Sequence, residues 1–279
     1  MSVQHIYLSP HPGDAVLSCG GRIATQVIAR QQNVLVLTVF AGRPDYINLS
    51  DVAREIHARW GHPSDPVGQR LAEEADALHV LRIASRQGDA VSALYREDPR
   101  SDRWLYASRA ALFGPLAPSD RELAVELAGD IATLAGPPDQ CHLYAPLAIG
   151  EYVDHQVVRR AAEILLDEGY LVWFYEDLPY AAQDGHLLEQ ALARPSRVTW
   201  AGQLQTMDDA ALTAKQAAIA CYHSPFWLWP MGTDILTLVI QHNRQAGTPG
   251  PAAERYWVQQ EARPRPRPRL PRPLLGRPE

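Results

Sequence analysis

The chain of 279 residues contains few cysteines and almost no lysine. Its three cysteines, Cys19, Cys141 and Cys221, are odd in number, and no two of them form a CxxC pair. This pattern argues against a disulfide framework and predicts free thiols in a reducing compartment. Lys215 is the only lysine, and the net charge is −6. The composition therefore gives no indication of nucleic-acid binding.

Long hydrophobic runs are also missing. No stretch reaches the roughly 18 apolar residues of a membrane-spanning helix, so we expect no membrane span. The first residues, MSVQHIYLS, lack the basic and apolar segments that are typical of a signal peptide. We therefore expect a cytoplasmic protein.

Three motifs of common enzyme classes are absent as well. No GxGxxG follows the first expected strand, and the chain contains neither a P-loop pattern nor GxSxG. These absences argue against a dinucleotide-binding protein, an NTPase and a serine hydrolase, respectively.

The sequence does contain an alternation of apolar strands and amphipathic helices. The segment 33–42, NVLVLTVFAG, is the clearest strand, because continuous apolar runs are typical of parallel strands buried on both faces. Further strands are expected at 4–9, 82–85, 142–149, 170–177 and 254–259, and helices at 14–30, 70–81, 119–136, 154–169, 208–222 and 232–244. The order predicts an α/β fold with a Rossmann-like, mostly parallel sheet and helices on both faces.

We expect a single domain over residues 1–260. Residues 261–279 are rich in arginine and proline, a composition that cannot form a packed core and predicts disorder. Within the domain, Ser119 with Glu122 three residues later predicts a capping box at the start of a helix. Arg96 is expected to form an ion pair at the surface.

Ligand-binding side chains in open α/β sheets gather beyond the carboxyl ends of the parallel strands. Polar residues follow three expected strands, namely His11 with Asp14, Asp154 with His155, and Glu176 with Asp177. Two imidazoles and one carboxylate form a common catalytic zinc site, so His11, Asp14 and His155 are candidate ligands. Asp154 is expected to hold the imidazole of its neighbour His155 in one tautomer. From the residues alone, a metal hydrolase is the leading interpretation, and ordinary solvated loop histidines are the alternative.

The segment 9–21, SPHPGDAVLSCGG, resembles the N-terminal motif of the PIG-L/LmbE-like N-acetylglucosaminyl deacetylase family. Other segments that resemble the family are LTVFAG, the helix beginning at Arg70, GDAVSALYRED, RWLYASRAALFG, GEYVDH, FYEDLPYA, KQAAIACYHSP and ERYW. The resemblance therefore extends over nearly the whole chain up to the arginine- and proline-rich tail.

This resemblance implies a zinc-dependent hydrolase that removes an N-acyl group, such as acetyl, from an N-acetylglucosamine-like sugar or glycoconjugate. It implies that zinc, or another divalent metal, binds His11, Asp14 and His155, and that Asp154 supports the catalytic histidine. Arg70 and Asp89 occupy places where family members contact the sugar. The expected partner is therefore a small molecule, and the oligomeric state stays open.

Two positions depart from the family pattern. Gly13 stands where the family has its general-base aspartate, and Tyr152 stands where it commonly has histidine. General base catalysis typically contributes about 10²–10⁴-fold, so its loss would impair hydrolysis without abolishing it. The Tyr152 hydroxyl can still donate a hydrogen bond to an oxyanion.

Two hypotheses follow from these departures. In the first, the chain is an active deacetylase in which Tyr152 stabilises the oxyanion and Glu151, Asp154 or Glu176 replaces the missing base. In the second, it is a catalytically degenerate family member that binds metal and sugar without turnover. A different reaction on the same metal is a third alternative.

Overall fold

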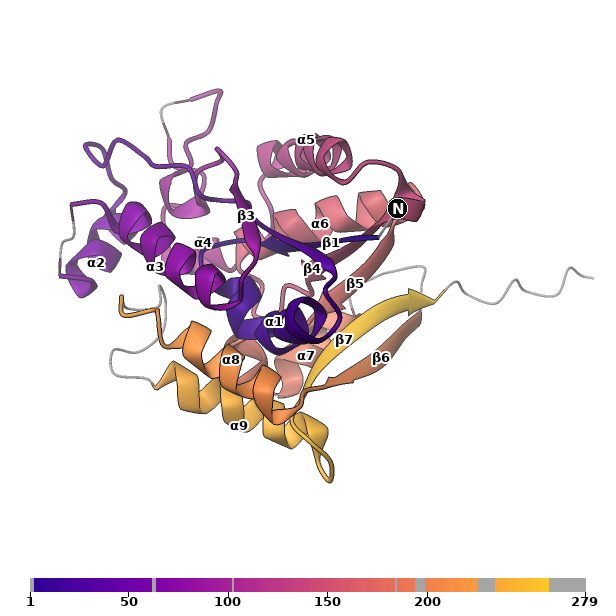
Figure 1. Cartoon of the computed structure of the whole chain (residues 1–279). Helices are drawn as coiled ribbons and strands as arrows, with labels where there is room; N and C mark the ends of the chain where they lie inside the picture. The colour runs from indigo at the N-terminus through magenta and orange to yellow at the C-terminus, as the bar shows by residue number, and fades with distance from the viewer. Residues whose placement is uncertain are drawn as a thin grey trace, which may run out of the picture.

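The computed structural model describes residues 3–61, 64–101, 103–183, 185–193, 199–224 and 234–260, so the expected tail 261–279 lies outside the described residues. The strands are β1 (Gln4–Ser9), β2 (Asn33–Thr38), β3 (Ala84–Gln87), β4 (Cys141–Pro146), β5 (Leu171–Tyr175), β6 (Thr199–Thr206) and β7 (Ala253–Gln260). They form one seven-stranded sheet in the order β3-β2-β1-β4-β5-β7-β6 (Figure 1). A single α/β domain is therefore built around this sheet.

The sheet is mostly parallel, as the sequence predicts. β3, β2, β1, β4 and β5 run parallel to one another, whereas β7 pairs antiparallel with both β5 and β6. The sequence pattern does not predict β6, because most of its side chains are exposed and it contains no apolar run. It is recognisable as a strand only through its pairing with β7.

Helices cover both faces of the sheet, which confirms the expected layers (Figure 1). One face carries α1 (Asp14–Ala24), extended by a π-helical turn to Ala29, with α3 (Pro66–Val80), α8 (Asp209–Ile219) and α9 (Ile235–Gly247). The other carries α5 (Pro118–Ala135), α6 (Val153–Asp167) and α7 (Gly185–Ala193). Along β1, Ile6 and Leu8 pack on the second group and Tyr7 on the first, so both faces of the strand are buried. This explains why the strand is apolar without alternation.

The start of α5 differs from the prediction. The helix begins at Pro118 with Ala117 as its N-cap, and no side chain caps it. The expected capping box of Ser119 and Glu122 is therefore wrong. Proline is favoured at the first helical position because it has no N–H to satisfy and a helical φ, and here it starts the helix before Ser119.

A third apolar cluster lies apart from the two faces of the sheet. It contains residues of the short helices α2 (Asp51–Arg59) and α4 (Arg109–Leu112), together with Tyr95, Tyr106 and Tyr152. The remaining regular elements are the 3₁₀ turns Ala93–Tyr95, Pro138–Gln140 and Tyr180–Ala182. Within the described residues, no helix is both long and apolar enough to cross a membrane.

Candidate active site

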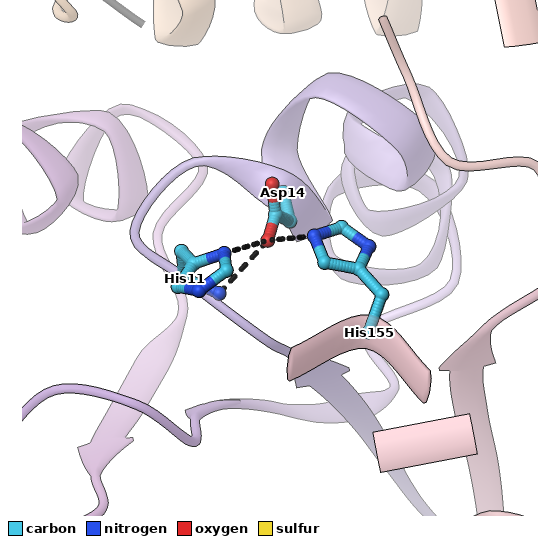
Figure 2. A group of neighbouring side chains, drawn as sticks. All are labelled: His11, Asp14 and His155. Atoms are coloured by element: carbon cyan, nitrogen blue, oxygen red, sulfur yellow. Dashed lines mark hydrogen bonds and ion pairs between the residues drawn. The ribbon is translucent and has the colours of Figure 1, made fainter. Parts of the chain in front are cut away.

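Three polar side chains meet beyond the carboxyl ends of β1 and β4. His11 lies in the loop after β1, Asp14 is the first residue of α1, and His155 lies in the first turn of α6. Asp14 Oδ2 is 3.3 Å from His11 Nδ1 and 3.3 Å from His155 Nε2, so the carboxylate lies between the two imidazoles (Figure 2). One ligand-type atom from each residue lies within 4.8 Å of the others. The carboxyl ends of neighbouring parallel strands thus bring together residues separated by more than 140 positions.

The loop after β1 is held in shape by its own hydrogen bonds. Ser9 Oγ donates to the carbonyl of His11 and accepts from the amide of Ala15. The His11 amide donates to Asp14 Oδ2 at 2.8 Å, which fixes that carboxylate against the loop. The positions of His11 and Asp14 therefore depend on a serine at the end of β1 and on the first turn of α1.

The far side of each imidazole contacts a second carboxylate. Asp154 Oδ2 is 2.7 Å from His11 Nε2, and Asp177 Oδ1 is 2.6 Å from His155 Nδ1. Both carboxylates are fully buried. In each ring this contact directs one nitrogen to a carboxylate and leaves the other facing Asp14, the arrangement that commonly orients metal-binding histidines.

The partner of Asp154 is a correction to the sequence interpretation. Asp154 was expected to support His155, its neighbour in the chain, but it contacts His11, and Asp177 supports His155. The reason is helical geometry: both residues lie in α6, where adjacent side chains point to different faces of the helix. The sequence alone also allows a purely structural role for Asp177 at the end of its strand. In the structure, Asp177 contacts the imidazole of His155, a candidate ligand.

The carboxylates strongly affect the protonation of the imidazoles. Burial by itself lowers the pKa of His155, but the charges and hydrogen bonds of Asp14 and Asp177 outweigh burial and raise that pKa to about 10. Burial also lowers the pKa of His11, but the hydrogen bonds and charges of Asp14 and Asp154 outweigh burial, so the pKa of His11 is raised as well. The site thus favours positive charge at its centre. A divalent cation meets the same preference, and its binding would displace these protons.

Asp154 belongs to a buried charge network with Arg96. Arg96 donates to Asp154 Oδ1 at 2.5 Å and to Asp120 Oδ2 at 2.6 Å, and Ser92 and the amide of Ala93 also donate to Asp154. Arg96 is only 8% exposed, so the expectation of a surface ion pair is wrong. Burial alone would raise the pKa of Asp154, but Arg96 and His11 hold it well below its usual range. Asp154 therefore remains ionised next to His11.

Tyr152 lines this network but is itself buried. Its ring centroid is 5.4 Å from that of His11, and its hydroxyl lies 3.5 Å from Ser92 Oγ. Burial and the charge of Asp154 raise the pKa of Tyr152 well above its ordinary value. The phenol is thus a hydrogen-bond donor at neutral pH, as the sequence interpretation requires, and it cannot act as a base.

The two expected substrate contacts have different surroundings. Arg70 is 4% exposed, and its Nη2 donates to the carbonyl of Pro12 at 2.6 Å, so it holds the loop after β1. Asp89 is exposed and pairs through its backbone with Phe40, whose ring centroid is 6.0 Å from that of His11. Asp89 therefore lies near the rim of the site, whereas Arg70 lies beneath its floor.

The other carboxylates considered as a replacement base are placed less favourably. Glu176 accepts hydrogen bonds from Arg255 and Trp257 and contacts His242. Burial by itself would raise the pKa of Glu176, but His242 and Arg255 lower it. Glu151, in the loop before α6, has an exposed side chain. Sequence reasoning did not identify Glu74, whose carboxylate contacts the amide of Gly13.

No family model matches the chain. The 2′-N-acetylparomamine deacetylase of Niallia circulans is 26% identical over 269 residues, which cover 91% of this chain and 90% of that protein. A deacetylase of the teicoplanin biosynthesis pathway, solved as a complex with bog, is 30% identical, with 94% of this chain and 100% of that chain covered and a TM-score of 0.79. The zinc-inhibited form of teicoplanin deacetylase is 29% identical, with 94% of this chain and 100% of that chain covered and a TM-score of 0.79.

The fold, the site and these similarities define a hydrolase of the N-deacetylase class, which acts on an amide. The chain belongs to the PIG-L/LmbE-like deacetylase family, as the motif at 9–21 indicates. The likeness extends over 94% of the chain.

Proposed function

We propose that the chain is a metal-dependent deacetylase that removes the acetyl group from an N-acetylated amino sugar of a glycoconjugate. The observation that carries the proposal is the His11–Asp14–His155 cluster, in which a carboxylate backs each imidazole. The similar proteins support the substrate class, since they are named as deacetylases of 2′-N-acetylparomamine and of teicoplanin.

The donor set fits a zinc ion or a related divalent cation. His11 Nδ1, Asp14 Oδ2 and His155 Nε2 provide two nitrogens and one oxygen, the composition of many catalytic zinc sites. All three residues are mostly buried, with side chains exposed by 16% or less. When bound there, the metal would polarise the amide carbonyl and lower the pKa of a water molecule.

The side chains around the cluster have distinct roles in this proposal. Asp154 and Asp177 orient the two histidines, and Arg96 keeps Asp154 ionised. Tyr152 donates its hydroxyl proton in a hydrogen bond to the developing oxyanion. Arg70 holds the carbonyl of Pro12 and so positions the loop, and Asp89 at the rim contacts the sugar.

The test is release of acetate from N-acetylated amino sugars. The purified chain is assayed on 2′-N-acetylparomamine and on a glycopeptide that carries N-acetylglucosamine, with zinc raised stepwise from one equivalent because one similar structure is a zinc-inhibited form. We expect acetate release that a chelator stops and one equivalent of metal restores. Metal and sugar binding without product would favour a binding protein instead, the alternative suggested by Gly13. A folded protein that binds no metal would contradict the metal site.

Asp177→Asn is expected to weaken metal binding by about 10–100-fold, since removal of a carboxylate behind a metal-binding histidine typically has this effect. The amide cannot stabilise the ring of His155 as the carboxylate does. The measurement is the zinc dissociation constant by competition with a chelator. Asp139→Asn, in an exposed turn, is the matched control and should bind zinc like the wild type. An unchanged affinity in Asp177→Asn would contradict the role of Asp177.

A further inference from the structure

Gly13 lies between His11 and Asp14 and has no side chain that could take a proton. Its backbone has a φ of 103°, in the left-handed region that glycine adopts without strain. In this conformation its amide donates to Glu74 Oε1 at 3.1 Å. The shape of the loop thus brings a carboxylate from another element into contact with the residue between two candidate ligands.

Glu74 reaches this place from α3. The residue is 3% exposed, and its second carboxylate oxygen, Oε2, accepts a hydrogen bond of 2.6 Å from Thr38 Oγ1. Thr38 is the last residue of β2 and pairs with Ser9, the last residue of β1. The carboxyl group of Glu74 is therefore fixed at the edge of the sheet where the cluster lies. Its two hydrogen bonds occupy about half of the four acceptor positions of a carboxylate, so it can still accept a proton.

The surroundings of Glu74 favour a proton-accepting group at neutral pH. Burial and, to a smaller extent, the negative charge of Asp14 raise the pKa of Glu74 to about 7, although the hydrogen bonds from Thr38 and Gly13 and the charge of Arg70 oppose this rise. The negative charge of Glu74 in turn raises the pKa values of its neighbours Arg70 and Tyr222 relative to what burial and their other surroundings would give. A general base is most effective when its pKa lies near the working pH.

The other carboxylates around the cluster already have defined partners. Asp154 is held by Arg96 and His11, Asp177 by His155 and the amide of Ile149, and Glu176 by Arg255 and His242. Asp14 is itself a candidate ligand. Glu74 differs from these because its hydrogen bonds come from neutral groups, a threonine hydroxyl and a backbone amide.

We propose that Glu74 is the general base of the reaction and takes over proton transfer at a site where position 13 is glycine. This inference rests on the proposed deacetylase function. As the water oxygen bonds to the amide carbon, a water proton passes to Glu74. The carbon–nitrogen bond then breaks, and Glu74 returns the proton to the leaving nitrogen. The products are the free amine of the sugar and acetate.

Glu74→Gln is the direct test, because glutamine keeps the size but accepts no proton. Its oxygen can accept the hydrogen bond from the Gly13 amide, and its NH2 can donate to Thr38 Oγ1 in place of the bond that Glu74 accepts there. We expect kcat to fall by about 10²–10⁴-fold, the usual contribution of a general base, with KM, bound metal and the unfolding temperature unchanged. Glu73→Gln is the matched control: Glu73 is the adjacent buried carboxylate of α3, and it binds Ser224. Glu73→Gln should keep the wild-type kcat.

Two further measurements separate a base from a structural carboxylate. In the wild type, kcat/KM should fall as the pH drops below about 7, because protonated Glu74 cannot act as a base. Thr38→Val removes a hydrogen bond that lowers the pKa of Glu74, so it should move this decline to higher pH. In metal-free protein with ¹³C-labelled glutamate, a carboxyl signal titrating near pH 7 should be present in the wild type and missing in Glu74→Gln.

Full activity with an unchanged pH profile in Glu74→Gln would overturn the assignment of Glu74. So would a Glu74 carboxyl signal that titrates in the ordinary range near 4.3, approximately the value for an exposed glutamate. Failure of the proposed function has a different signature, because the wild type itself would then release no acetate. The ratio of variant to wild type thus tests Glu74, and the wild type alone tests the function.

Discussion

Replacing His155 by alanine is expected to remove the bound metal and to lower kcat/KM by about 10³-fold or more. The variant leaves one imidazole and one carboxylate, too few donors for a catalytic zinc site, and metal polarisation of the carbonyl contributes several kcal/mol. The His155 side chain is 2% exposed and contacts Asp14 with one ring nitrogen and Asp177 with the other, so its loss affects the centre of the cluster. Metal content by elemental analysis and acetate release measure the two effects.

His186→Ala is the control for the His155 variant. The His186 side chain is 79% exposed and forms an ion pair with Glu189 of the same helix, so its replacement should leave metal content and activity unchanged. Retention of one equivalent of metal by a folded His155→Ala protein would contradict the ligand assignment. Loss of metal without loss of acetate release would contradict metal dependence.

Replacing Arg96 by methionine is expected to lower the free energy of unfolding by about 3–5 kcal/mol, the usual cost of removing one partner from a buried ion pair. Methionine keeps most of the length of the side chain but leaves Asp120 and Asp154 buried without their cation. Urea unfolding at pH 7 measures the change. Arg100→Met, which removes an exposed arginine 3.8 Å from Glu122, is the control and should change stability little.

The destabilisation of Arg96→Met should depend on pH in a defined direction. Arg96 holds the pKa of Asp154 below the value near 3.9, approximately that of an unfolded aspartate, so its stabilising effect is fully present above that pH. As the pH falls below about 4, Asp154 becomes protonated in the unfolded state first, and this contribution is progressively lost. The difference between wild type and variant should therefore be largest at neutral pH and shrink under acid. A difference that stays constant with pH would contradict the role of the ion pair.

Much of the fold can be predicted from local patterns. The apolar runs that become β1, β2, β4 and β5 and the amphipathic segments that become α1, α3, α6 and α9 are recognisable without tertiary information. Their alternation specifies a parallel sheet, because each helix returns the chain to the same edge. β6 and the N-cap of α5 are exceptions, since a polar edge strand depends on its partner and a proline can start a helix before the expected cap.

The candidate ligands could be predicted for the same reason. Since parallel strands end at one edge, residues that follow β1 and β4 must lie close together, whatever the loops between them contain. This places His11, Asp14 and His155 side by side in the structure (Figure 2). The sequence alone therefore determined the fold class and the group of residues that forms the cluster.

Only the tertiary structure decided which groups surround that cluster. Asp154 reaches His11 across 143 positions, Arg96 is buried by the segments that pack over it, and Glu74 contacts Gly13 across 61 positions. Each of these contacts depends on the direction in which a side chain points and on how deeply it is buried. The spacing of residues along the chain determines neither the direction nor the burial. Burial and neighbouring charge then set the protonation of these groups. The candidate ligands could therefore be predicted from the sequence, whereas the proposed base follows only from the fold.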